Sequence, residues 1–163
     1  MPAAATPAPT ARARCASADP SVSDPFRQRP SPEALTQLLA GTAGESLGIT
    51  ITEVGSDFLR GTMPVDRRTV QPFGLLHGGS SVLLAETLAS LAGYLCLEPG
   101  AQQQAAGIEI NANHLRAVTE GVVTGTARPI HLGRATQVWE IRIEDAKGRL
   151  ACISRMTAAV VGR

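Results

Sequence analysis

One segment of the sequence, residues 78–97, reads as a long helix with apolar or small residues on nearly every side. A helix of this kind needs cover around most of its surface. Most of the remaining chain instead shows the two-residue period of β-strands. We therefore expect a curved antiparallel sheet wrapped around this one helix, with a second subunit covering what the sheet leaves open.

Strand-like alternation occurs in six segments, residues 47–54, 58–65, 107–116, 120–130, 136–144 and 149–161. It is clearest where Trp139, Ile141 and Ile143 alternate with charged residues. That pattern indicates one face on a core and one face in water, as in antiparallel sheets. Residues 145–148 form a turn between the last two strands.

The N-terminal part of the chain differs in composition from the rest. Residues 1–30 are rich in Pro and Ala and carry hardly any large apolar side chains, which predicts a flexible leader. Ser31 and Pro32 suit the start of a short helix that ends at Gly41 or Gly44. Its leucines repeat at helical spacing, at Leu35, Leu38 and Leu39. The predicted organisation is one α+β domain over residues 31–163.

Composition excludes several classes of function. The net charge is +1 with no block of like charges, which does not favour nucleic acid or an anionic membrane surface. The longest apolar stretch, residues 82–97, is shorter than the ~20 residues of a bilayer span. Three separated cysteines, Cys15, Cys96 and Cys152, read as free thiols of a reducing compartment, so we expect the cytoplasm. The spacing of His77, His114 and His131 matches no compact metal-ligand pattern.

Glu86 is the only charged residue in the long helix, and three interpretations of it are open. A solvated residue would have polar neighbours, whereas Val82, Leu83 and Ala89 share its face. A buried ion pair would need a distant cation, since no Lys or Arg occurs between Arg68 and Arg116. A catalytic carboxylate would gain strength as a base or nucleophile from a medium of low dielectric constant.

The tripeptide His77–Gly78–Gly79 marks the expected start of this helix. First-turn amides lack intrahelical partners, and glycine lets a ligand approach closely, so such amides can stabilise an oxyanion. Alternatively, the glycines only relieve crowding against the sheet. Gly78 and Glu86 would lie about 12 Å apart along the axis. If both act on one carbonyl carbon, Glu86 must therefore come from a second copy related by a two-fold axis.

Four segments in order carry a resemblance to a known family: MPVDRRTVQPFGLLHGGSSVLLAETLASLAGYLC, GIEINANHLR, PIHLGRATQVWEIRIEDAKGRL and SRMT. They resemble the hotdog-fold acyl-CoA thioesterases. Within that family, they are most similar to the 4-hydroxybenzoyl-CoA thioesterases of the Arthrobacter type and the 1,4-dihydroxy-2-naphthoyl-CoA thioesterases. The similarity covers about residues 31–161. It implies five or six antiparallel strands wrapped around one long helix, dimers with shared sites, and dimers paired into homotetramers.

The resemblance also implies roles for residues of the reaction site. Glu86 would be the catalytic carboxylate, acting as nucleophile or as base for water. The Gly78 amide of the partner subunit would polarise the thioester carbonyl. Gln71 and His77 would orient the thioester and the water, and Ser90 would hold the water or the carboxylate. No cofactor is implied, because coenzyme A is part of the substrate.

Coenzyme A contacts of the family fall on three stretches of this sequence. By position they are Gly107, then His114, Leu115, Arg116 and Ala117, and finally His131, Leu132, Gly133, Arg134, Ala135 and Thr136. Arg116 and Arg134 would bind phosphate, since a guanidinium matches phosphate oxygens and stays charged. The residues alone favour a different interpretation of His114 and His131, as hydrogen-bonded residues at strand ends. Ala117 and Thr136 depart from the polar and basic residues found in relatives, and residues 97–106 look locally longer.

Two other functions compete with thioester hydrolysis. One is a non-catalytic acyl-CoA sensor, against which the joint presence of Glu86, Gly78, Gln71 and Ser90 argues. The other is hydration of an enoyl-CoA, which in related folds pairs an Asp with a nearby His. No such pair occurs near Glu86. The acyl group itself is not predicted beyond a preference for aromatic acyl-CoA substrates.

Overall fold

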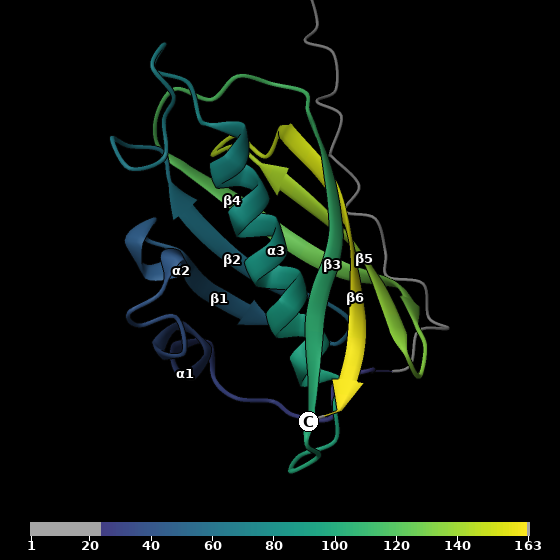
Figure 1. The fold of residues 1–163 in the computed structure, drawn as a ribbon. Helices are drawn as coiled ribbons and strands as arrows, with labels where there is room; N and C mark the ends of the chain where they lie inside the picture. Colours follow the sequence, from purple (N-terminus) through teal and green to yellow (C-terminus); the bar gives the residue numbers. More distant parts are fainter. Residues whose placement is uncertain (1–23, 163) are drawn as a thin grey trace, which may run out of the picture.

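The computed structural model describes residues 24–162, and these form one antiparallel sheet around a long helix (Figure 1). The elements in chain order are α1 (Pro32–Gln37), α2 (Ala43–Ser46), β1 (Thr50–Val54), β2 (Leu59–Pro64), α3 (Gly78–Leu95), β3 (Gln103–His114), β4 (Val122–Leu132), β5 (Thr136–Glu144) and β6 (Leu150–Gly162). The strand order is β1-β2-β4-β5-β6-β3, so β1 and β3 are the edges. This is the expected α+β hotdog fold.

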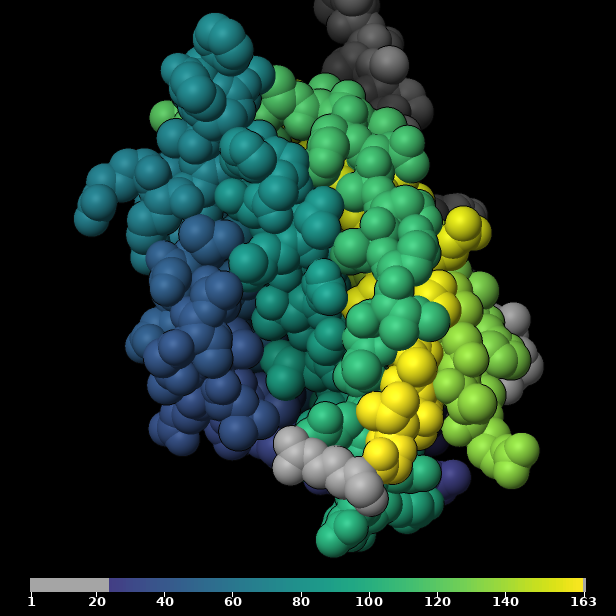
Figure 2. Space-filling view, in the orientation of Figure 1, coloured from purple at the N-terminus to yellow at the C-terminus, as the bar shows by residue number. Residues whose placement is uncertain are grey.

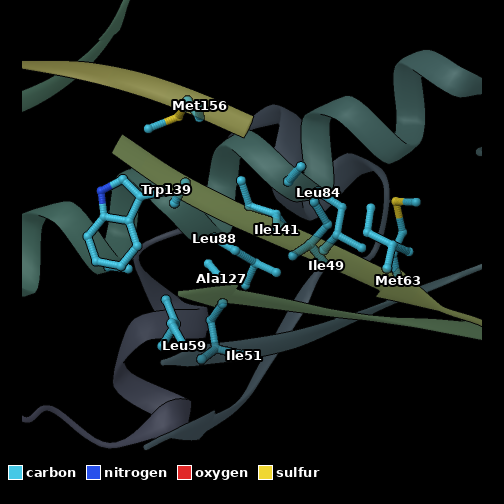
Figure 3. Close-up of a cluster of buried hydrophobic side chains, with 14 of the residues drawn as sticks. Ile49, Ile51, Leu59, Met63, Leu84, Leu88, Ala127, Trp139, Ile141 and Met156 are labelled. Atoms are coloured by element: carbon cyan, nitrogen blue, oxygen red, sulfur yellow. The ribbon is translucent and has the colours of Figure 1, made fainter. Parts of the chain in front are cut away.

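The core lies between α3 and the sheet (Figure 3). Trp139, Ile141 and Ile143 of β5 are fully buried, which confirms the alternation predicted for that strand. α3 lies close to the sheet because β2 and β4 place glycines opposite each other. A Cβ at Gly61 or Gly125 would come within 2.9 Å or 2.6 Å of the Leu88 side chain. In the described part of the chain, no helix is long and apolar enough to cross a membrane.

Most predicted elements are confirmed, with differences in the short N-terminal helix and at the start of β3. The short N-terminal helix is interrupted, because α1 ends at Gln37 and a second helical turn, α2, follows. Leu35 and Leu39 are buried as expected, but Leu38 is exposed. Strand β3 begins at Gln103 instead of Gly107. The earlier start was not predicted because residues 103–106 are too polar and too small to show alternation.

Strand β3 contains a β-bulge beside α3. Its register with β6 passes from Gly107 opposite Ala158 to Glu109 opposite Thr157, so Ile108 is the extra residue and is 65% exposed. The bulge changes which residues face the helix. Ala105 faces it before the bulge, whereas Ile110 faces it after.

The boundary of the leader differs from the prediction, because residues 24–30 belong to the folded domain. Phe26 is buried in the core, and the amides of Arg27 and Gln28 both donate to the Leu95 carbonyl, at 2.8 Å and 3.2 Å. These bonds satisfy the C-terminal end of α3, where carbonyl groups lack intrahelical partners. The signal for this contact was a single aromatic residue among prolines. The rest of the predicted leader, residues 1–23, lies outside the described residues.

Replacing Phe26 with Ala is expected to lower the free energy of unfolding by about 3 kcal/mol, because it removes a buried aromatic ring and leaves a cavity at the end of α3. Urea denaturation followed by circular dichroism measures the change. Leu38→Ala serves as the control, since that side chain is 59% exposed. Equal stability of the two variants would show that the N-terminal segment does not contribute to the fold.

The two described cysteines, Cys96 and Cys152, are free thiols, as predicted. Burial raises the pKa of Cys96 to about 11, so this thiol stays protonated near neutral pH and is a poor nucleophile. Cys15 lies outside the described residues.

Candidate active site

The face of α3 that points away from the sheet carries a groove of about 520 Å³. It is lined by Gly79, Val82, Leu83, Glu86, Thr87 and Ser90. Figure 2 shows this part of α3, in teal, at the surface between the N-terminal segments and β3. Glu86 is therefore not a fully buried residue of the single chain. It is a half-buried carboxylate in an otherwise mostly apolar groove.

Glu86 is packed against the edge strand. A Cβ on Gly107 would lie 2.7 Å from Glu86 Oε1, so only glycine leaves the carboxylate its present position. Glu86 has no hydrogen bond or ion pair with any residue that the structure describes. This excludes, for residues 24–162, the interpretation of Glu86 as half of an internal ion pair.

Ser90 lies one turn after Glu86 in the same groove and contacts strand β6 beneath it. Its hydroxyl donates to the thioether sulfur of Met156, with Oγ and Sδ 3.9 Å apart. The same sulfur would be 3.7 Å from a Cβ on Gly107. Glu86, Ser90, Gly107 and Met156 thus form one cluster, which combines three residues expected at the site with one that was not.

The N-terminus of α3 is held by His77, which is its N-cap residue. The Gly79 amide donates to His77 Nδ1 at 2.8 Å, which leaves Nε2 as the protonated nitrogen of the neutral ring. The Ser80 and Ser81 amides donate to the His77 carbonyl. Within residues 24–162, the Gly78 amide has no acceptor. One N–H group at the positive end of α3 is therefore free to bind a ligand.

His114, at the end of β3, lies against the same helix end. Its Nε2 is 2.7 Å from the position that a Cβ on Gly78 would take. The following backbone is fixed, because the Leu115 and Arg116 amides both donate to the Ala151 carbonyl. A side chain at position 78 would therefore displace this imidazole, and glycine leaves the ring its present position.

Gln71 lies in the loop that leads into α3. Its amide donates to the Leu75 carbonyl at 2.8 Å, and its side-chain oxygen accepts from the Phe73 amide. The side-chain nitrogen remains as the group that a substrate could meet. The loop also leaves Phe73 87% exposed.

Two of the segments expected to bind coenzyme A, those that begin at His114 and at His131, lie near opposite ends of strand β6 in one subunit. His114 is paired with Cys152 of β6, whereas Ala135, in the β4–β5 hairpin, accepts a hydrogen bond from Val160 of the same strand. Those two positions on β6 are about 26 Å apart at the usual rise of a strand. His114 and Arg116 are therefore separated from the residues 131–136 group unless a second chain brings them together, whereas Gly107 and Gln137 both pair with Ala158 of β6, so Gly107 lies near that group in the same chain.

Known proteins share both the sequence and the fold. A family model described as the thioesterase superfamily matches residues 73–152. The 1,4-dihydroxy-2-naphthoyl-CoA hydrolase of Escherichia coli K12 is 54% identical over 129 residues, which are 79% of this chain and 93% of that protein. The chain belongs to the thioesterase superfamily. The proofreading thioesterase EntH of Cronobacter sakazakii is 55% identical over 130 residues, 80% of this chain and 93% of its own length.

Solved thioesterase structures have the same architecture. A thioesterase from Haemophilus influenzae superposes with a TM-score of 0.81 at 50% identity, covering 84% of this chain and 94% of its own. A thioesterase mutant from Pseudomonas aeruginosa gives 0.82 at 48% identity, covering 85% and 99%. The protein is thus a thioester hydrolase with the hotdog fold, as expected.

Several contributors to this thioesterase site were not predicted. Thr87 lines the groove, Met156 contacts Ser90 beneath it, and His77 caps α3; none of these three roles was predicted. Met156 could have been found by strand parity, because it shares a face of β6 with the buried Cys152 and Ser154. No three His, Cys, Asp or Glu side chains cluster as metal ligands in the described part of the chain. The prediction of a reaction without metal or cofactor stays a prediction.

Proposed function

We propose that this thioesterase hydrolyses an acyl- or aroyl-coenzyme A thioester to the free acid and coenzyme A, with Glu86 as nucleophile or general base. The observation that carries the proposal is a carboxylate in a mostly apolar groove, on a helix whose first amide is free. Neither group has a partner among residues 24–162. The names of the relatives support the substrate class, since one is a naphthoyl-CoA hydrolase. They favour an aromatic acyl group.

Hydrolysis of a thioester needs few catalytic groups from the protein. A thioester carbonyl is already reactive, so a carboxylate and an amide dipole can be sufficient. The Gly78 amide would donate to the carbonyl oxygen as negative charge develops there. Glu86 would either attack the carbonyl carbon or take a proton from the attacking water, which Ser90 would hold. Gln71 would orient the thioester through its side-chain nitrogen, and His77 through Nε2.

The proposal requires two copies of the chain. Gly78 and Glu86 lie about 12 Å apart along α3, so one carbonyl group cannot meet both groups of one chain. Antiparallel α3 helices related by a two-fold axis would bring Gly78 of each copy opposite Glu86 of the other. The loop before one helix would then lie beside the C-terminal half of the other. That arrangement would cover Phe73 and Tyr94, which are 87% and 43% exposed.

Strand β3 also supports association with a second copy. It is a 12-residue edge strand, and proteins rarely leave so long an edge unpaired in water. The same two-fold axis would bring the β4–β5 hairpin of one copy towards His114 of the other. Arg116 and Arg134 could then bind phosphates of one coenzyme A molecule from two chains. Pairing of such dimers into tetramers is part of the proposal.

The test is thiol release from a panel of naphthoyl-, benzoyl- and medium-chain acyl-coenzyme A esters, with the free acid identified by mass spectrometry. We expect turnover with a preference for an aromatic acyl group. Coenzyme A binding without thiol release from any ester would favour the sensor. Water addition to an enoyl-coenzyme A with the thioester intact would favour the hydratase.

A further inference from the structure

We infer that His114 supplies a second hydrogen-bond donor to the thioester carbonyl oxygen, beside the Gly78 amide of the same chain. This inference rests on the proposed function. It assigns His114 to the reacting carbonyl group instead of to coenzyme A binding. The imidazole lies where a side chain of residue 78 would otherwise be, with Nε2 2.7 Å from that Cβ position. The free amide of Gly78 is bonded to the same Cα, so the ring lies beside the residue that carries this amide.

The surroundings leave His114 available for this role. Its side chain is exposed and has no hydrogen bond to any residue between positions 24 and 162. The backbone after it is tied to Ala151, which holds the end of β3 beside the start of α3. The other imidazole at this helix end, His77, is already engaged through Nδ1 as the N-cap. His77 therefore has only Nε2 left for a ligand, whereas neither ring nitrogen of His114 is engaged within the described residues.

The position of the ring suits donation to a carbonyl oxygen. The N-terminus of α3 carries partial positive charge, which favours negative charge developing on an oxygen held there. An imidazole at a helix N-terminus can polarise a carbonyl by donating its N–H. We therefore expect Nε2–H of His114 to face the oxygen that the Gly78 amide binds.

The first test is kinetic. His114→Ala is expected to lower kcat about 100-fold, the effect of removing one oxyanion donor, with little change in KM. His114→Gln keeps an N–H donor and is expected to recover at least a tenth of the lost rate. Asn113→Ala is the matched control, because it alters the neighbouring residue on the opposite face of β3 and should leave kcat unchanged. A higher KM at unchanged kcat would return His114 to coenzyme A binding and overturn the inference.

The second test reads the hydrogen bond directly. A methylene ketone analogue, in which CH₂ replaces the thioester sulfur and the carbonyl carbon is ¹³C, is bound to wild type and variants. Donation to the oxygen shifts the carbonyl signal downfield, so His114→Ala should move it upfield and His114→Gln should restore it. An unchanged signal in His114→Ala overturns the inference even if the rate falls. If wild type hydrolyses no thioester, the proposed function fails as well, whereas a failure confined to His114 leaves it standing.

Discussion

Glu86→Gln will lower kcat by two or more orders of magnitude and leave the fold intact. The amide has almost the same shape but can neither attack the carbonyl nor accept a proton from water. The structure adds a reason to expect an intact fold, since Glu86 makes no hydrogen bond or ion pair with residues 24–162 that the change could break. Thiol release under saturating substrate measures kcat, and circular dichroism and thermal unfolding check the fold.

Glu144→Gln is the matched control for this prediction. Glu144 lies on β5 with its side chain on the face of the sheet away from α3, so its change should leave kcat as in wild type. Full activity of Glu86→Gln would make Glu86 a structural residue of the groove. In that case the free amide of Gly78 would still need a different partner in catalysis.

Gly78→Pro will lower kcat about 100-fold relative to Gly78→Ala. Gly78 is the first residue of α3, where proline fits the helix and removes only an N–H that has no intrahelical acceptor. His77 already has the extended backbone that a residue before proline prefers, with φ −70° and ψ 134°. Both variants add a Cβ that presses on His114, so their difference isolates the amide.

Equal rates for the two Gly78 variants would show that the amide does not contact the reacting carbonyl. A displaced helix start would show instead as a lower thermal midpoint for Gly78→Pro than for Gly78→Ala. The prediction is that the two midpoints agree within a few degrees, since the helix loses no hydrogen bond.

A mixture of the two inactive variants will test the shared site. In a dimer formed from one Glu86→Gln chain and one Gly78→Pro chain, one of the two sites contains both intact groups. Unfolding and refolding the variants together should therefore restore about a quarter of the wild-type rate. No recovery, with mixed dimers demonstrated by mass spectrometry, would place Glu86 and Gly78 in separate sites.

Much of the fold could be predicted from periodicity, and part of the site could not. The alternation of Trp139, Ile141 and Ile143 and the apolar run of α3 report burial directly, and both are confirmed. Ile108 could not be identified as an extra residue, because a bulge depends on the register with a strand more than forty residues later. The contact of His114 with Gly78 likewise joins positions that only the tertiary fold brings together.

Phe26 and the groove show two further limits of sequence reasoning. A single aromatic residue in a proline-rich stretch has no period, so its burial depends on a free space at the end of α3 that the sequence does not reveal. Glu86 could be singled out by its isolation among apolar residues. Its half-exposed position could not be predicted, because no local pattern says which side of a helix the sheet leaves open.

The bulge in β3 places two requirements on one residue position. Deleting Ile108 would make the pairing with β6 regular, but it would also exchange the inward and outward faces of one half of the strand. Either the glycine would turn away from the carboxylate or Ile110 would turn away from the core. An insertion or deletion of one residue in β3 would therefore disturb either the site or the core. To keep both, it needs a compensating change elsewhere along the same strand.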